Sequence, residues 1–302
     1  MKRRLFMQTV AAGIAGTAFA APPAFKLRYA LSSALYGELP LDVIVPEVTR
    51  AGCDVIDIWC KVHGNQREQI EEMGDKAFRD LLREHGTKLG VSTRYPLGPF
   101  GLADELRWVK SCGGALIVTG SSGPQDPVGV EAKAAMQTFL EKMKPHVELA
   151  ESLGVTIAIE NHAGQLLYHP DSLRYFGEFN RSRNLGIAFA PHHLYRWQAE
   201  IPHLIRDLGA EQLPFIYFQE HSEGMFKATS KEVEMQQLPG FGGTLDYSSL
   251  LRALRDIRFA GFVEIFMHPT PRGVPILPTV AEITAAINKS RHYIEQKLAE
   301  LD

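Results

Sequence analysis

Short apolar runs alternate with amphipathic stretches along most of the chain. Eight of these runs have the length and the residue types of buried strands: 27–31, 55–59, 89–93, 115–118, 155–160, 186–190, 215–218 and 262–266. Between them, apolar residues recur every three or four positions, as at Met136, Phe139, Leu140 and Met143, which is the period of an amphipathic helix. Strands that are apolar almost throughout, separated by helices, indicate a parallel sheet covered on both faces.

Eight strand–helix repeats favour closure into a single (β/α)8 barrel, and 302 residues are enough for one such barrel and a leader. The alternative is an open, doubly wound sheet. However, no Gly-x-Gly-x-x-Gly motif follows any predicted strand, and no Walker-type phosphate loop is present. The segment Gly120-Ser121-Ser122-Gly123 is one residue short of the nucleophile elbow of serine hydrolases.

Charge and cysteine content exclude some classes of partner and chemistry. The formal net charge is -3, which gives no electrostatic reason to expect nucleic acid as a partner. The three cysteines, Cys53, Cys60 and Cys112, have no Cys-x-x-Cys spacing, so neither a structural zinc site nor a disulfide framework is expected.

The N-terminus has the organisation of a secretory signal. Lys2, Arg3 and Arg4 precede a weakly apolar stretch rich in Ala, Gly and Thr, which ends in Ala18-Phe19-Ala20. The adjacent arginines followed by Phe6 resemble a twin-arginine export signal, although Lys2 stands where that motif usually has Ser or Thr.

We therefore expect residues 1–20 to be a cleavable export signal and residues 21–302 to form the barrel domain. The apolar stretch is too short to span a bilayer, so no stable membrane insertion is expected once the signal is removed. The expected location is the periplasm or another exported compartment.

Polar residues gather where the predicted strands end, and in a barrel these positions converge on one mouth. The residues are Asp57, Trp59, Arg94, Tyr95, Glu160, Asn161, His162, His192, His193, Gln219, Glu220, His221, Glu264 and His268. Such a set can build a metal site, a general acid–base pair, or both. Glu160 stands out because a carboxylate at the end of a core strand is costly to bury without a partner.

Four segments resemble the xylose-isomerase-like barrel superfamily, which contains sugar isomerases and epimerases, inosose dehydratase-like enzymes and the endonuclease IV type of nuclease. The segments are 51–59, 157–162, 186–193 and 259–265, and the resemblance covers essentially the whole mature chain. The strongest local match, Ile159-Glu160-Asn161-His162, implies that Glu160 is a metal ligand from the fifth strand.

The chain departs from the ligand pattern that the resemblance implies. Ala190 occupies the position of the sixth-strand Asp, while His193 is retained three residues later. Tyr217 falls at the seventh-strand His, and Phe266 falls at the eighth-strand Glu, with Glu264 two residues earlier.

Strand alternation suggests a replacement set, because residues two apart face the same way. Two residues beyond Ala190, Tyr217 and Phe266 lie His192, Gln219 and His268, and the equivalent position after Glu160 is His162. These four residues with Glu160 could hold a divalent metal such as zinc or manganese. The alternative is a metal-free pocket in which the histidines bind sugar hydroxyls.

The implied chemistry is proton transfer at a carbon next to a carbonyl or a hydroxyl-bearing centre. We expect Glu160 to be the base, Glu264 its partner across the mouth, and His193 a group that binds hydroxyls or shares the proton. For Glu264 the alternative is an internal carboxylate held by an arginine such as Arg94. The expected substrate-binding residues are Trp59, Arg94, Asn161, Tyr217 and His221.

The sequence thus favours an exported isomerase, epimerase or lyase that acts on a small carbohydrate, either a free or keto sugar or a polyol. A different class, supported by the departures, is a barrel that binds carbohydrate without catalysis. Phosphodiester cleavage of the endonuclease IV type would need a fuller metal set and a basic groove.

Overall fold

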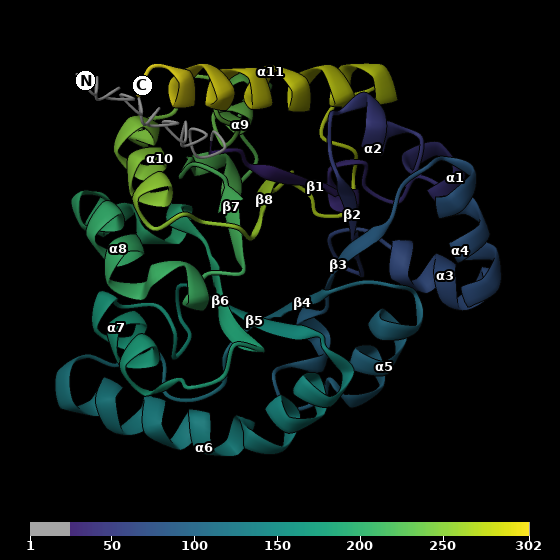
Figure 1. The fold of residues 1–302 in the computed structure, drawn as a ribbon. Coiled ribbons are helices and arrows are strands. Elements are labelled where there is room, and N and C mark those ends of the chain that lie inside the picture. The colour runs from purple at the N-terminus through teal and green to yellow at the C-terminus, as the bar shows by residue number, and fades with distance from the viewer. Residues whose placement is uncertain (1–24, 302) are drawn as a thin grey trace, which may run out of the picture.

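The computed structural model describes residues 25–301 and forms a closed barrel of eight parallel strands, each paired with its neighbours in sequence order (Figure 1). The strands are β1 Arg28–Ser32, β2 Val55–Trp59, β3 Leu89–Thr93, β4 Leu116–Thr119, β5 Thr156–Glu160, β6 Leu185–Phe189, β7 Phe215–Phe218 and β8 Phe262–Ile265. The pairing of β1 with β8 closes the ring. The predicted (β/α)8 barrel is confirmed, and each predicted strand agrees to within one residue at either end.

Helices form the outer layer around the ring of strands (Figure 1). The α-helices are α1 Leu41–Ile44, α2 Glu47–Arg50, α3 Gln66–Met73, α4 Asp75–Glu84, α5 Ala103–Ser111, α6 Gly129–Leu153, α7 Pro170–Phe179, α8 Ile201–Gln212, α9 Lys231–Met235, α10 Tyr247–Asp256 and α11 Val280–Ala299. Short 3-10 helices follow several strands: η1 Ser33–Leu35, η2 Tyr95–Leu97, η3 Pro191–Glu200 and η4 Glu223–Met225.

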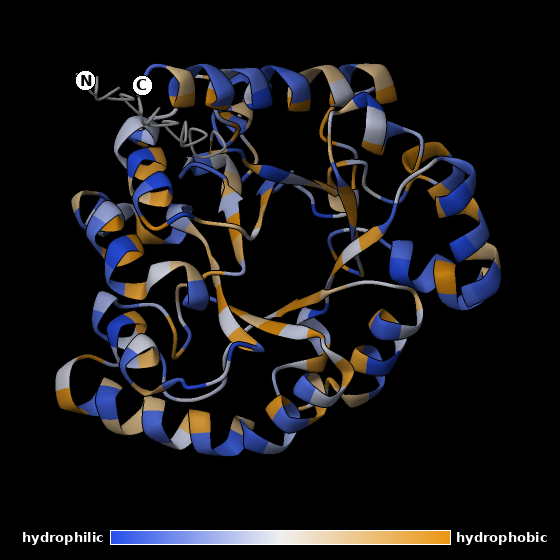
Figure 2. Ribbon diagram, in the orientation of Figure 1, coloured by the Kyte–Doolittle hydropathy of each residue, from blue (hydrophilic) through white to orange (hydrophobic). Residues whose placement is uncertain are grey.

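The strands are apolar on both faces because one face packs against the helices and the other fills the barrel. Figure 2 shows this as largely hydrophobic strands inside helices whose hydrophilic residues face outward. Paired residues of parallel strands face the same way, so the pairings of Glu160 with Ala188 and of Tyr217 with Glu264 place all four on the inner face.

The predicted export signal lies outside the described residues. Within residues 25–301, no helix is long and apolar enough to cross a membrane.

Candidate functional site at the carboxyl ends of the strands

Glu160 is the last residue of β5 and lies at the mouth of the barrel. The preceding helix α6 ends at Leu153 and is capped by Gly154, whose φ of 64° is left-handed and therefore favours glycine. The chain turns there into β5, which runs apolar until Glu160. The side chain is 4% exposed, so its carboxylate needs partners in the protein or in a ligand.

A phenol and an imidazole lie beside the Glu160 carboxylate. The Tyr95 hydroxyl, on η2 after β3, donates a hydrogen bond to Oε2. His193 Nε2 lies 3.6 Å from Oε1. The Tyr217 hydroxyl lies 3.2 Å from the Tyr95 hydroxyl, so a chain of two phenols leads from β7 to the carboxylate.

Burial determines the protonation states in this cluster. It raises the pKa of Glu160, while the charge of His162 and the Tyr95 hydrogen bond oppose the rise. Burial and then the charge of Glu160 raise the pKa of Tyr95 and of Tyr217 well above the usual value. Both phenols therefore keep their protons at neutral pH and act as donors.

The two consecutive histidines His192 and His193 lie beside Glu160. β6 ends at Phe189, and η3 begins at Pro191, so both imidazoles belong to a tight 3-10 segment at the strand end. Their ring centroids are 4.1 Å apart, and burial lowers the pKa of each well below its usual range. Both imidazoles are therefore neutral at neutral pH.

A metal ion fits this group of side chains. One ligand atom each of Glu160, His192 and His193 lies within 4.8 Å of the others. Both ring nitrogens of His192 and Nε2 of His193 are buried and have no hydrogen-bond partner among the described residues. A carboxylate with neutral imidazoles is a typical donor set for zinc.

The predicted ligand set overlaps this group only in part. Glu160 and His192 belong to both sets, and His193, which we expected to act on substrate, joins them. The ring of His162 packs against His193, with centroids 4.0 Å apart, and its Nδ1 lies 2.7 Å from the Ala163 carbonyl oxygen.

Gln219 and His268, predicted to lie at the same height, do contact each other. Gln219 Nε2 lies 2.9 Å from His268 Nδ1 and also donates to Gln237 Oε1 at 2.9 Å. The Gln237 side chain bonds the backbone N–H and carbonyl of His268 as well. Sequence reasoning missed Gln237, because it follows α9 and not a strand.

Aromatic rings line the β2 and β8 side of the mouth. Trp59 stacks on Phe266 with centroids 4.6 Å apart and planes at 10°, and it lies 5.8 Å from the Tyr95 ring. His63, in the loop after β2, contacts both Trp59 and His268 at 5.2 Å between centroids. We did not predict His63. The sequence feature that could have pointed to His63 is its position four residues after the end of β2.

Glu264 is not at the mouth, which corrects its predicted place opposite Glu160. It is fully buried beside Asp57, and the two lie one rung below Phe266 and Trp59 on the same faces of β8 and β2. The Phe266–Trp59 stack therefore separates them from the mouth. The alternative of an internal carboxylate agrees with this burial, but Arg94 does not hold Glu264, since Arg94 Nε faces Glu105 Oε2 at 3.7 Å.

Two further predicted substrate contacts have other partners. The Asn161 amide donates to the Ala190 carbonyl at 3.0 Å and accepts from the Ala190 N–H at 2.7 Å, so it joins β5 to β6 and is fully buried. His221 stacks on Tyr195 with centroids 3.7 Å apart, at the β7 side of the mouth.

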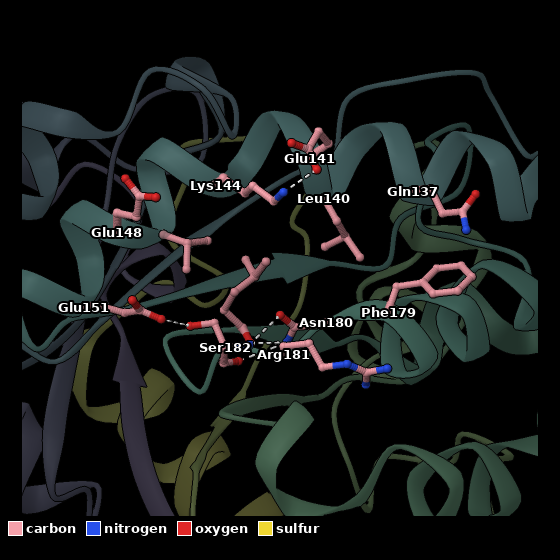
Figure 3. A pocket seen from close by; sticks show the side chains of 12 residues that line it. Gln137, Leu140, Glu141, Lys144, Glu148, Glu151, Phe179, Asn180, Arg181 and Ser182 are labelled. Carbon is pink, nitrogen blue, oxygen red and sulfur yellow. Dashed lines mark hydrogen bonds and ion pairs between the residues drawn. The ribbon is translucent and has the colours of Figure 1, made fainter.

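A pocket on the outer surface is separate from this site. Its volume is about 570 Å³, and it lies between α6 and the segment that joins α7 to β6, with Leu140, Phe179 and Arg181 on its walls (Figure 3). None of the predicted site residues lines it.

A closed parallel barrel with a buried carboxylate, two phenols and neutral imidazoles at its carboxyl ends defines a (β/α)8 protein with its candidate site at the usual face of that fold. The family described as xylose isomerase-like TIM barrel matches residues 45–286, and the chain belongs to this family. No curated protein matches the chain significantly in sequence.

Several solved structures share the fold over nearly their whole length. An IolI protein with a bound zinc atom is 15% identical, with 91% of this chain and 99% of that one covered and a TM-score of 0.68. D-allulose 3-epimerase from Methylomonas sp., in complex with D-allulose, is 13% identical, with 91% and 98% covered and a TM-score of 0.66. L-ribulose 3-epimerase is 15% identical, with 91% and 96% covered and a TM-score of 0.66.

Proposed function

We propose that this chain is an isomerase, epimerase or lyase that moves a proton on a small sugar or polyol, with Glu160 as the base. The observation that carries the proposal is the environment of Glu160. It is a buried carboxylate at the barrel mouth with a raised pKa, bonded by Tyr95 and beside His193. A carboxylate whose pKa is raised is a stronger base in its ionised form.

The residues around Glu160 have complementary roles in this proposal. Glu160 takes the proton from a carbon next to a carbonyl group, and the negative charge that develops on the carbonyl oxygen needs hydrogen-bond donors. Tyr217 remains protonated and can turn its hydroxyl from Tyr95 to that oxygen, while Tyr95 keeps its hydrogen bond to Glu160. His193, being neutral, can accept or donate a proton at a neighbouring hydroxyl.

Glu160, His192 and His193 would hold a divalent ion in this site. Such an ion stabilises negative charge that develops on a substrate oxygen. The known relatives support this part of the proposal, since the IolI structure contains a zinc atom.

The carbohydrate substrate class is supported by the walls of the site and by the relatives. Trp59, Tyr95 and Phe266 present aromatic rings that suit the apolar faces of a sugar. D-allulose is bound in one neighbouring structure, and another was determined in the presence of D-fructose. Export of the chain remains part of the proposal and rests on the Arg3-Arg4 signal pattern.

Solvent exchange tests the proposal whichever product the reaction forms. The full mature chain is incubated in D2O with a panel of ketoses, including D-allulose and D-fructose, and of keto sugars, and deuterium incorporation is followed by NMR. We expect exchange on at least one sugar and a loss of about 10²- to 10⁴-fold in its rate for Glu160→Gln. Binding of that sugar to the metal-free chain, measured by calorimetry, should change little, because glutamine keeps the size and a hydrogen-bond acceptor of the side chain.

Glu220→Gln is the matched control. Glu220 is also a buried carboxyl at a strand end, but its Oε2 accepts from the Leu245 N–H, a bond that glutamine can keep. The control variant should retain exchange. If Glu160→Gln exchanged as fast as the wild type, Glu160 would not be the base.

A binding protein without catalysis is the second candidate. This candidate is favoured by the loss of three metal ligands that the family resemblance implies, since their positions hold Ala190, Tyr217 and Phe266. Calorimetric binding of a sugar by the wild type, with no exchange on any member of the panel, would support this candidate over the enzyme.

A further inference from the structure

A second pair of acidic side chains lies inside the barrel, below the site. Asp57 of β2 and Glu264 of β8 are both 0% exposed. Both strands flank β1, where Ser32 pairs with Asp57 and Ala30 pairs with Glu264. The mechanism proposed above uses neither carboxyl group.

Several polar atoms around this pair are buried without a hydrogen-bond partner among the described residues. They are both carboxyl oxygens of Glu264, Oδ1 of Asp57, Oγ of Ser32 and Nε1 of Trp59. Ser32, Asp57 and Trp59 are the side chains that lie against the Glu264 carboxyl. Only Oδ2 of Asp57 is satisfied, by the Thr93 hydroxyl at 2.7 Å.

So many unpaired polar atoms in one place indicate a ligand. Each buried donor or acceptor left alone costs about 1–3 kcal/mol, and native proteins contain few of them. A buried water bonds typically to about three such groups. Ser32, Asp57, Trp59 and Glu264 supply that number and more.

The charge of the pair must also be balanced. Among the described residues, neither carboxyl has a lysine, arginine or histidine within ion-pairing distance. Two adjacent carboxylates in a buried site cannot both be ionised without a large penalty, so they share a proton or hold a cation. The Trp59 indole favours the shared proton, because Nε1–H can only donate and a cation would compete with it for the carboxyl oxygens.

We propose that Ser32, Asp57, Trp59 and Glu264 form an internal water-binding site in which the two carboxyl groups share one proton, and that this site positions Trp59 at the floor of the mouth. The water accepts from Trp59 Nε1–H and donates to carboxyl oxygens. Asp57 and Glu264 are thus positioning residues for the ring that stacks on Phe266.

The Asp57–Glu264 pair can be titrated without interference from the titratable groups around it. Burial raises the pKa of Asp57 to about 6. The other titratable groups near the pair are Tyr217 and Cys53, whose pKa values burial raises far above neutrality. Those beside Trp59 are Tyr95, whose pKa is also raised, and His63, whose pKa burial lowers to about 4.

The indole N–H resonance of Trp59 reports on this site in the intact chain. With ¹⁵N-tryptophan, the three tryptophans of the sequence give three indole signals, and Trp59→Phe assigns the one of interest. We expect that signal to shift between pH 5 and 8 with a midpoint near 6. The Asp57→Asn/Glu264→Gln double variant should lose the shift, and Glu160→Gln, which alters only the mouth carboxylate, should keep it.

Two measurements can overturn the proposal. A Trp59 signal that does not shift, or that shifts equally in the double variant, would show that the pair does not act on Trp59. A high-resolution crystal structure of the wild type should show a water against Trp59 Nε1 and Glu264, whether or not the double variant folds. A dry site, or a metal ion there by anomalous scattering, would contradict it.

Discussion

Glu160 and Glu264 are two buried glutamates on the inner face of one barrel, and their neighbours differ completely. Glu160 ends β5 and has a phenol donor and an imidazole beside it. Glu264 is the third of four residues in β8, and its nearest ionisable neighbour is another acid. Burial raises the pKa of both, but at Glu264 the charge of Asp57 raises it further, whereas His162 and Tyr95 oppose the rise at Glu160. Depth along the strand therefore decides whether a carboxylate can take part in chemistry.

The largest expected difference between the two regions is metal binding. After dialysis and repletion with Zn²⁺ or Mn²⁺, we expect one ion per chain, because the ligand atoms of Glu160, His192 and His193 lie close together. His192→Ala should weaken binding by about 100-fold or more, since even residues that only support a ligand contribute 10- to 100-fold. Elemental analysis and competition with a chelator measure this.

Two control variants test the metal site, one with a substitution at the mouth and one with substitutions below the Trp59–Phe266 stack. His268→Ala should bind the ion nearly as the wild type does, because His268 is not in the close group of Glu160, His192 and His193, and Gln219 occupies its Nδ1. Asp57→Asn/Glu264→Gln should also retain it. Loss of the ion in either control, with retention in His192→Ala, would place the metal elsewhere.

The interior pair should make the fold less stable as pH rises. Asp57, with a pKa of about 6, binds its proton more tightly in the folded chain than in the unfolded chain, where the value is near 4. The free energy of unfolding therefore falls as pH rises from about 4 to 6, by roughly 2 to 3 kcal/mol for this group.

Denaturant unfolding at several pH values measures that slope. The Asp57→Asn/Glu264→Gln variant should lose this component, while the part due to Glu160 and Glu220, whose pKa values burial also raises, should remain. An identical pH dependence in wild type and variant would show that the pair does not titrate in this range.

The smallest predicted effect concerns the phenol at the mouth. Tyr95→Phe removes the hydrogen bond that lowers the pKa of Glu160, so that pKa should rise further. The acidic limb of the exchange rate should move to higher pH, and the rate should fall by about tenfold, as expected for one hydrogen bond to a charged group.

Tyr217→Phe is its matched control. The Tyr217 hydroxyl contacts Tyr95 and not Glu160, so the acidic limb should move less than in Tyr95→Phe. Equal shifts in the two variants would mean that Glu160 is tuned by the pair of phenols together.

The barrel could be predicted from sequence because its strands are continuous apolar runs with clear ends. Gly154 and the apolar residues up to Ile159 fix where β5 starts and stops, and this alone places Glu160 at the mouth. The family model then confirms the class of barrel.

Side-chain partners beyond the strand ends could not be predicted, because alternation stops where the strand stops. Pro191 begins a 3-10 segment, so His192 and His193 both face Glu160, although alternation allows only one of them to do so. Asn161 looked like a substrate contact, yet its amide completes the backbone pairing of Ala190. Neither outcome has a local sequence signal.

The Asn161–Ala190 bridge has a mechanical consequence. Asn161 directly follows Glu160, and Ala190 directly precedes Pro191-His192-His193, so one side chain couples the carboxylate to both imidazoles after the sheet ladder has ended. The barrel scaffold thus fixes the positions of the Glu160 carboxylate and the two imidazoles relative to one another. Surface loops farther out can vary in length and composition without disturbing it.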